Sequence, residues 1–193
     1  MATELTLDPK RTALVVIDLQ KGIAGRPTEP HAAASVVSNA ARLAEACRKS
    51  GSTVVLVRVT FSADGADRLK QPVDEPMVGG PMPADWAELV PELGQIASDI
   101  VITKRQWGAF YGTELDLQLR RRGIDTILLC GISTNMGVES TARDAFELGY
   151  ALVLVEDAMA SMNAAMHGHT VERIFPRLGR VRSTEQTVQA LTR

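Results

Sequence analysis

Short runs of consecutive apolar residues alternate along the chain with longer segments in which apolar residues recur every three or four positions. The first pattern is typical of strands buried on both faces of a sheet, and the second predicts amphipathic helices. Strands are predicted over 12–17, 53–57, 99–103, 126–129 and 151–155 and around Val181. Helices are predicted over 36–47, from the cap residue Thr113 through Leu115 and Leu119, over 138–145 and after Ser183. Strands separated by helices in this order predict a doubly wound, three-layer α/β/α fold with a mostly parallel, six-stranded sheet.

One segment, residues 62–91, interrupts this alternation. It contains five prolines and the Gly79-Gly80 pair, and a short helix is expected around Trp86. An irregular segment of this length within a compact domain is usually a lid, a binding loop or an oligomer contact. The sequence otherwise predicts a single domain over residues 1–193.

Composition narrows the class of protein. Of 193 residues, 45% are apolar, which is enough for a substantial core, and 21 basic against 23 acidic residues leave no basic excess for binding nucleic acid. The apolar runs are too short to cross a bilayer, and the charged N-terminus does not resemble a signal peptide. The two cysteines, Cys47 and Cys130, cannot form a disulfide framework. We therefore expect a cytoplasmic protein with no membrane or nucleic-acid partner.

Candidate chemistry lies where predicted strands end. Asp18 follows the first strand, Lys104 follows the third, and the turn 131–137 joins the fourth strand to its helix. Ligands of doubly wound sheets bind at this carboxyl edge. Taken alone, each charged residue could equally well be a functional residue or simply the first solvent-exposed residue after a buried strand. The turn lacks the spacing of a dinucleotide fingerprint and the chain has no Walker sequence, so nucleotide binding is unsupported.

Taken together, these segments resemble the isochorismatase-like hydrolase family, whose cysteine-dependent members include nicotinamidases and related amidohydrolases. The resemblance is carried by ALVVIDLQ at 13–20, KRQWGAFYGT at 104–113, LRRRGIDT at 119–126, the segment 131–149 and EDA at 156–158. The run GISTNMGVESTAR at 131–143 looks especially like the YecD-type branch. The resemblance implies a catalytic triad of Asp, Lys and Cys, whose first two positions are Asp18 and Lys104. It also implies a cis peptide between Ile132 and Ser133.

The chain departs from the family pattern at the nucleophile. Gly137 stands where the resemblance places the cysteine. Loss of a nucleophile from a coupled triad typically lowers the rate by about a million-fold, so thiol catalysis is not expected. Cys130 lies seven residues earlier in a predicted strand, where a buried, inert thiol is expected.

Two reaction types remain possible for such a site, and a protein without catalytic activity is the alternative. Asp18 would carry a proton, Lys104 would stabilise charge, and backbone N–H groups near Ser133 and Gly137 would hold an anion. The combination resembles true isochorismatases, which also have Gly at this position and use the Asp to protonate a vinyl ether. If Asp18 stays ionised, it would instead activate water against an amide or ester. The alternative is a catalytically silent member that binds a metabolite or serves as a structural oligomer.

Acid catalysis meets a physical difficulty. A carboxyl group of ordinary pKa, about 3.9, is protonated in roughly one molecule per thousand at pH 7. A neighbouring Lys104 would lower this fraction, whereas burial would raise it. Acid catalysis by Asp18 therefore requires desolvation or anionic substrate groups to outweigh Lys104.

The remaining site predictions concern the pocket and its ligands. Residues expected to line a pocket for a small substrate are Gln20, Trp107, Phe110, Tyr111 and Asn135. The aromatic residues are equally compatible with the core or a subunit contact, and Gln20 with an orienting role toward Asp18 or a surface position. Asp157 is expected to be a turn and cap residue. A homo-oligomer, dimer or tetramer, is expected.

Three histidines are the candidate metal ligands: His31, His167 and His169. Nicotinamidase-like relatives carry an Asp-x-His motif with a further His after the second strand, but here residues 58–64 read RVTFSAD. We therefore predict no metal and no cofactor.

Overall fold

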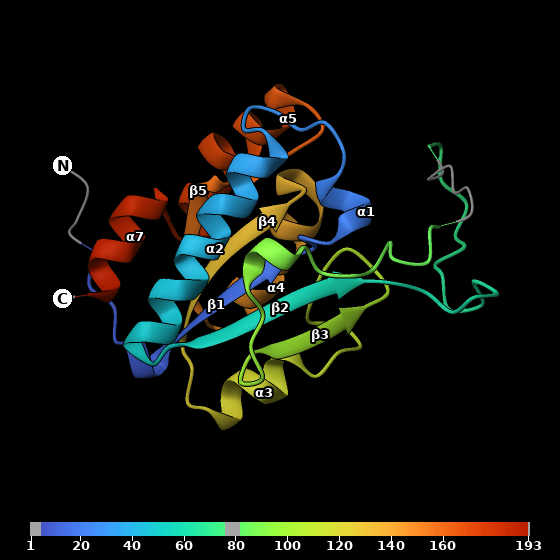
Figure 1. The fold of residues 1–193 in the computed structure, drawn as a ribbon. Coiled ribbons are helices and arrows are strands. Elements are labelled where there is room, and N and C mark those ends of the chain that lie inside the picture. The colour runs from blue at the N-terminus through green and yellow to red at the C-terminus, as the bar shows by residue number, and fades with distance from the viewer. Residues whose placement is uncertain (1–4, 76–81, 193) are drawn as a thin grey trace.

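The computed structural model describes residues 5–75 and 82–192. A six-stranded sheet with the order β3-β2-β1-β4-β5-β6 forms its centre (Figure 1). The strands are β1 (Thr12–Ile17), β2 (Thr53–Val59), β3 (Ile100–Lys104), β4 (Thr126–Ile132), β5 (Ala151–Ala160) and β6 (Arg180–Arg182). Every neighbouring pair is parallel. The predicted doubly wound α/β fold is thus confirmed, and the sheet is parallel throughout.

Helices cover both faces of the sheet. They are α1 (Lys21–Ala24), α2 (Ala33–Ser50), α3 (Leu115–Arg121), α4 (Glu139–Glu147), α5 (Ala164–His169), α6 (Phe175–Leu178) and α7 (Thr184–Leu191). Helices α2 and α7 contribute to the core on one face, and α3, α4 and α6 to the core on the other (Figure 1). The apolar periodicity did not predict α1, α5 and α6, because helices of four to six residues are too short to show it. No helix in the described ranges is both long and apolar enough to span a bilayer.

The continuous apolar run of β1 follows from burial on both faces. Leu14 and Val16 pack in the core beneath α2, whereas Val15 and Ile17 pack in the core beneath α3 and α4. All six residues of the strand are buried. A central parallel strand therefore needs apolar side chains at successive positions, and polar residues become tolerable only where the strand ends.

The last helix begins as the sequence predicts. Ser183 accepts a hydrogen bond from the backbone N–H of Gln186, whose side chain returns to Ser183 to complete a capping box. Asp157, predicted as a cap residue, accepts hydrogen bonds from the backbone N–H (2.7 Å) and the hydroxyl (2.8 Å) of Thr184. This carboxylate therefore anchors α7 to β5.

The segment 62–91 differs from its prediction in one respect. Pro76, Gly79, Gly80 and Pro81 lie outside the described residues. Over 62–75 and 82–90 the chain forms turns, and the short helix expected around Trp86 is wrong. The Trp86 indole packs on α1 so closely that a Cβ atom on Gly22 would lie 2.0 Å from it. This contact, together with a hydrogen bond of 3.0 Å from the backbone N–H of Gly22 to the carbonyl of Trp86, holds the segment at that point.

Candidate active site

Three sequence positions meet at the carboxyl edge of the sheet, where the strand order reverses between β1 and β4. Asp18 follows β1, Lys104 ends β3, and Gly137 lies in a π-helical turn, Thr134–Val138, that joins β4 to α4. Ligands of open α/β sheets bind in the crevice at such a switch point. The topology therefore places these three positions, which are distant in the sequence, at the same edge of the sheet.

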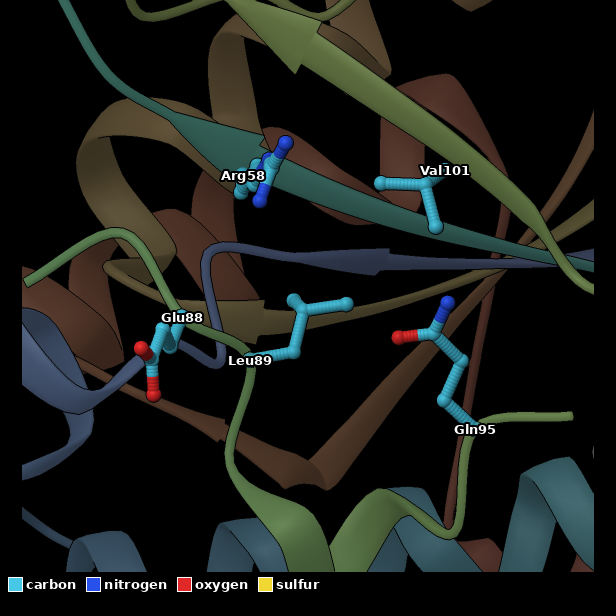
Figure 2. A pocket seen from close by; sticks show the side chains of 5 residues that line it. All are labelled: Arg58, Glu88, Leu89, Gln95 and Val101. Atoms are coloured by element: carbon cyan, nitrogen blue, oxygen red, sulfur yellow. The ribbon is translucent and has the colours of Figure 1, made fainter. Parts of the chain in front are cut away.

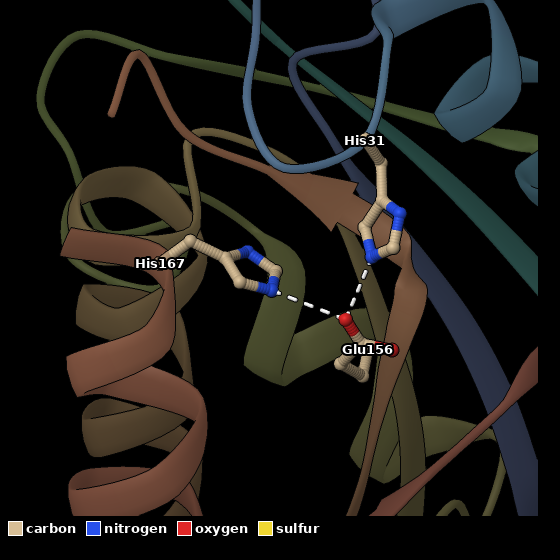
Figure 3. A group of neighbouring side chains, drawn as sticks. All are labelled: His31, Glu156 and His167. Carbon is tan, nitrogen blue, oxygen red and sulfur yellow. Dashed lines mark hydrogen bonds and ion pairs between the residues drawn. The ribbon is translucent and has the colours of Figure 1, made fainter. Parts of the chain in front are cut away.

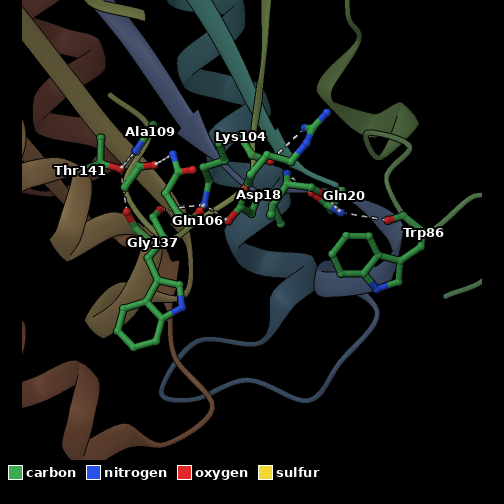
Figure 4. Close-up of polar contacts among 12 residues, drawn as sticks. Asp18, Gln20, Trp86, Lys104, Gln106, Ala109, Gly137 and Thr141 are labelled. Atoms are coloured by element: carbon green, nitrogen blue, oxygen red, sulfur yellow. Dashed lines mark hydrogen bonds and ion pairs between the residues drawn. The ribbon is translucent and has the colours of Figure 1, made fainter. Parts of the chain in front are cut away.

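Asp18 and Lys104 form a buried ion pair. Lys104 Nζ lies 2.8 Å from Asp18 Oδ2, and the side chains are 2% and 7% exposed, respectively. Lys104 Nζ also donates hydrogen bonds to the backbone carbonyls of Gln106 (3.1 Å) and Trp107 (2.7 Å) (Figure 4). An ammonium group has three protons, and these contacts provide three acceptors. Lys104 is therefore held in place with its donors fully used.

Only one of the two carboxyl oxygens of Asp18 has a polar partner among the described residues. Its Oδ1 atom is buried and has no hydrogen-bond partner among the described residues, while Oδ2 contacts Lys104. The backbone of Asp18 adopts a φ of +54°, an unusual value for a residue other than glycine. Its backbone N–H donates a hydrogen bond to the carbonyl of Val57. Burial raises the pKa of the Asp18 carboxyl to about 6, and the charge and hydrogen bond of Lys104 offset only part of this effect. At this pKa the carboxyl can exchange a proton near neutral pH.

Gly137 lies directly against this pair. A Cβ atom added to Gly137 would be 3.1 Å from Ile17 Cγ2, 3.3 Å from Asp18 Oδ2 and 3.4 Å from Lys104 Nζ. A side chain at this position would therefore touch both charged groups. The peptide between Ile132 and Ser133, at the start of the same turn, is cis.

Thr141 joins the segments around Gly137, a role that the sequence analysis missed. Its hydroxyl donates to the carbonyl of Gly137 (2.7 Å) and accepts from the backbone N–H of Ala109 (3.1 Å). The loop after Lys104 is thereby fastened to the first turn of α4 (Figure 4). The signal in the sequence was a threonine four residues after Gly137, the spacing at which a helical hydroxyl reaches back to a carbonyl.

Ser133 and Asn135 belong to a network of side chains. Asn135 Oδ1 accepts hydrogen bonds from the hydroxyl of Ser133 (3.2 Å) and from the hydroxyl of Ser161, and the two hydroxyls lie 2.9 Å apart. Ser161 is buried and was not predicted. The network ties the turn after β4 to the end of β5.

Several predicted pocket residues have other surroundings. Gln20 is fully buried, and its amide bonds the backbone N–H and carbonyl of Val59 and the carbonyl of Trp86, so it neither orients Asp18 nor lies on the surface. Phe110 packs in the core beneath α3 and α4. Tyr111 is 82% exposed and Trp107 is 54% exposed. The Gln20 amide is therefore held by backbone groups and the Phe110 ring by the core, and the prediction that these two residues line a pocket stays a prediction.

A shallow depression lies elsewhere, between the outer strands and the segment before β3. It has a volume of about 420 Å³, and Figure 2 shows the side chains that line it. Its lining residues are Arg58, Glu88, Leu89, Gln95 and Val101. None of these is a member of the Asp18 and Lys104 pair or its polar contacts.

Both cysteines are buried in the core on the α2 face of the sheet. Ile17, which Gly137 approaches, packs on the opposite face. Burial raises the pKa of the Cys47 thiol to about 12 and raises that of Cys130 strongly as well. Thiols with raised pKa are poor nucleophiles, so neither cysteine is prepared for covalent catalysis.

A second polar cluster lies beside the turn after β4. His31, from the loop before α2, and His167, from α5, both direct Nε2 toward the same carboxylate oxygen of Glu156 on β5 (Figure 3). His169 is exposed and is not part of this cluster. Glu156 was not predicted as a partner of the histidines, because it lies far from His31 in the sequence.

Comparisons with known proteins identify the family. The sequence model of the isochorismatase domain matches residues 12–186. The isochorismatase family protein YecD of Escherichia coli O157:H7 is 57% identical over 97% of this chain and 100% of that protein. A ureidoacrylate amidohydrolase, RutB of Cronobacter turicensis, is 32% identical over 80% of this chain and 76% of that protein.

A solved structure gives the same result for the fold. An isochorismatase family protein from Burkholderia thailandensis superimposes with a TM-score of 0.95 and 43% identity, covering 99% of this chain and 100% of that one. This likeness includes the parallel sheet whose carboxyl edge carries the ion pair. The chain therefore belongs to the isochorismatase family.

Proposed function

We propose that the protein is a hydrolase of small molecules that works by proton transfer at Asp18 and forms no covalent intermediate with the chain. The observation that carries the proposal is the buried Oδ1 atom of Asp18, which has no hydrogen-bond partner among the described residues, while Oδ2 of the same carboxyl lies next to Lys104 and Gly137. One carboxylate oxygen is held by Lys104, which leaves the other free to give or accept a proton. The chain resembles cysteine hydrolases, but it has Gly137 at the position expected for their nucleophilic cysteine. This departure also supports a reaction without a covalent intermediate.

The raised pKa of Asp18 removes the main objection to acid catalysis. At a pKa of about 6, roughly a tenth of the molecules carry the proton at pH 7, about a hundred times more than for an ordinary aspartate. Protonation of the carbon of a vinyl ether would make the adjacent carbon electrophilic. Water then adds there, the resulting hemiketal breaks to a ketone and an alcohol, and a proton from the water returns to Asp18.

Lys104 and the turn after β4 would serve the anionic part of the substrate. Lys104 has no free donor, so its contribution is the positive charge that it holds beside the reacting group. The turn Thr134–Val138 leads directly into α4, and the N-terminal end of a helix favours negative charge. We assign Ser133 and Gly137 to this anion-binding role through their backbone N–H groups.

A second candidate reaction is hydrolysis of an amide or ureido group by water that ionised Asp18 activates. It is favoured by the likeness to the ureidoacrylate amidohydrolase. The two reactions require opposite protonation states of one carboxyl. Acid catalysis predicts activity that declines as the pH rises above about 6, and base catalysis predicts activity that increases over the same range.

The test is a product assay on isochorismate, simple amides and ureido acids with the wild-type protein and Asp18→Asn. We expect turnover of at least one substrate and a loss of about 10² to 10⁴-fold in kcat/KM in the variant, the usual contribution of a general acid or base. Glu147→Gln is the matched control, because this exposed carboxylate lies at the opposite end of α4 from Gly137.

Three results would contradict the proposal. The first is full activity in Asp18→Asn, and the second is an acylated wild-type chain detected by intact-protein mass spectrometry during turnover. The third is absence of turnover combined with a rise in Tm on adding one of the compounds, which would indicate the silent, metabolite-binding alternative.

A further inference from the structure

We propose that His31, Glu156 and His167 form a binding site for a zinc-like divalent cation, separate from the Asp18 and Lys104 pair. One ligand atom from each residue lies within 4.8 Å of the other two. His31 Nε2 is 2.6 Å and His167 Nε2 is 3.3 Å from Glu156 Oε1. Two imidazoles and one carboxylate are the protein ligands of many zinc sites that leave a fourth position for water. The proposal revises the absence of a metal that the sequence predicts.

The three ligands come from separate segments that are fixed independently. His31 lies in the loop before α2, Glu156 on β5 and His167 on α5. The backbone of Glu29, two residues before His31, exchanges two hydrogen bonds of 2.8 Å with Ser161 at the end of β5. This bridge positions the loop over the strand whether or not a cation is bound.

The ring of His167 is oriented as in many metal sites. Its Nδ1 atom lies 2.9 Å from the hydroxyl of Thr134, and this contact turns Nε2 toward Glu156. A hydrogen bond from the second ring nitrogen is the usual support of a metal-bound histidine. The side chain of His167 is 4% exposed, whereas those of His31 and Glu156 are 30% and 33% exposed. The site is therefore rigid on one side and open to a water ligand on the other.

Binding requires a small rearrangement. Bonds of about 2.0 to 2.1 Å in a tetrahedral arrangement place ligand atoms about 3.3 Å apart. The contact between His31 and Glu156 must therefore lengthen, and the exposed loop of His31 can supply the movement. Both histidines would offer the Nε2 lone pair and keep the proton on Nδ1, which His167 then donates to Thr134. Because Thr134 begins the turn that contains Gly137, the cation would join that turn to β5, α5 and the loop of His31.

Titration of chelator-treated protein with ZnCl₂ by calorimetry tests the site. We expect about one zinc per chain, bound about 100-fold more weakly by His31→Gln and by Glu156→Gln and about 10-fold more weakly by Thr134→Val. His169→Gln should bind as the wild type does, since this histidine is on the same helix but outside the cluster. Zinc should also raise the Tm of the wild type and of His169→Gln, but not that of the two ligand variants.

Circular dichroism in chelator checks that each variant is folded. If Glu156→Gln does not fold, His31→Gln carries the test, because its side chain is partly exposed and lies in a loop. Failure of the wild type to bind zinc, or equal binding by the wild type and the folded ligand variants, would overturn the proposal and leave the three side chains as a hydrogen-bonded cluster. These measurements do not depend on catalytic activity, so they stand apart from the proposed function.

Discussion

At the scale of single residues, Asp18 makes the stability of the fold depend on pH. Its pKa is about 6 in the folded state against an ordinary value of 3.8, so the folded state holds the proton more tightly. Its contribution to stability is fully present below about pH 4 and is lost as the pH rises through about 6. The difference corresponds to about 3 kcal/mol.

Urea denaturation between pH 4 and pH 8 measures this contribution. The free energy of unfolding of Asp18→Asn should depend less on pH between 4 and 6.5 than that of the wild type. Identical pH dependence in the two proteins would show that Asp18 titrates normally in the folded state.

Lys104 gives a second prediction at this scale. Lys104→Met keeps the length of the side chain but leaves the Asp18 carboxylate buried without its cation. We expect a destabilisation of about 3 to 5 kcal/mol at pH 8, the usual effect of breaking a buried ion pair, and a smaller one at pH 5, where Asp18 is mostly protonated.

Lys49→Met is the matched control for Lys104→Met, because the ion pair of Lys49 with Glu45 is exposed and should contribute less than about 1 kcal/mol. Guanidinium denaturation at the two pH values is the measurement. An equal destabilisation at pH 5 and pH 8 would contradict the raised pKa of Asp18.

The sequence indicated which residues would meet at the edge of the sheet, but not which hydrogen-bond partners their polar atoms would have. Asp18 and Lys104 stand out because each follows an apolar strand. The buried amide of Gln20 cannot be assigned from sequence, because its partners on Val59 and Trp86 are backbone groups 39 and 66 residues away. The pairing of His31 with His167 through Glu156 is equally non-local.

At the scale of elements, the absence of a side chain at Gly131 allows β4 to lie close to β1. Its φ is +125°, and a Cβ atom would lie 2.1 Å from the carbonyl oxygen of Ile17. Gly131→Ala should therefore destabilise the protein by more than about 3 kcal/mol, since backbone strain and a clash with the backbone add together.

Gly149→Ala separates the two effects. Gly149 also has a positive φ, +84°, but a Cβ atom there would meet nothing within 4 Å. We expect this control to lose only about 1 kcal/mol, the conformational part. Chemical denaturation of both variants is the measurement, and a loss at Gly131 no larger than that at Gly149 would contradict the close approach of the strands.

Elements were predicted where the pattern is long and were missed where it is short. The buried strands and α2 have continuous or periodic apolar residues, so their positions followed from sequence. The π-helical turn Thr134–Val138 has no such signal, because tertiary contacts hold it, including the hydrogen bond between Thr134 and His167. Here the geometry of the candidate site depends on packing rather than on local preference.

At the scale of the whole molecule, the fold leaves several large apolar side chains exposed. Leu117 is 48% exposed on α3, and Phe146 and Leu148 are 50% and 42% exposed at the end of α4. Arg120 of α3 donates a hydrogen bond to the carbonyl of Leu148, so these two elements adjoin at this point. Exposed apolar surface of this kind favours association.

We expect a dimer or tetramer, and light scattering after size-exclusion chromatography measures it. The mass should be two or four times that of the 20.8 kDa chain. A mass of one chain across the micromolar range would show that the protein is a monomer and that these residues are simply solvated.

The most direct test of the account is the pKa of Asp18 itself, because the proposed chemistry requires a carboxyl that exchanges its proton near neutral pH. NMR titration of aspartate carboxyl carbons, with Asp18→Asn to assign the resonance, measures it without a substrate. We predict a transition near pH 6 that is absent from the variant. A transition of Asp18 at or below pH 4 would contradict the account, because its carboxylate would then be an ordinary ionised partner of Lys104.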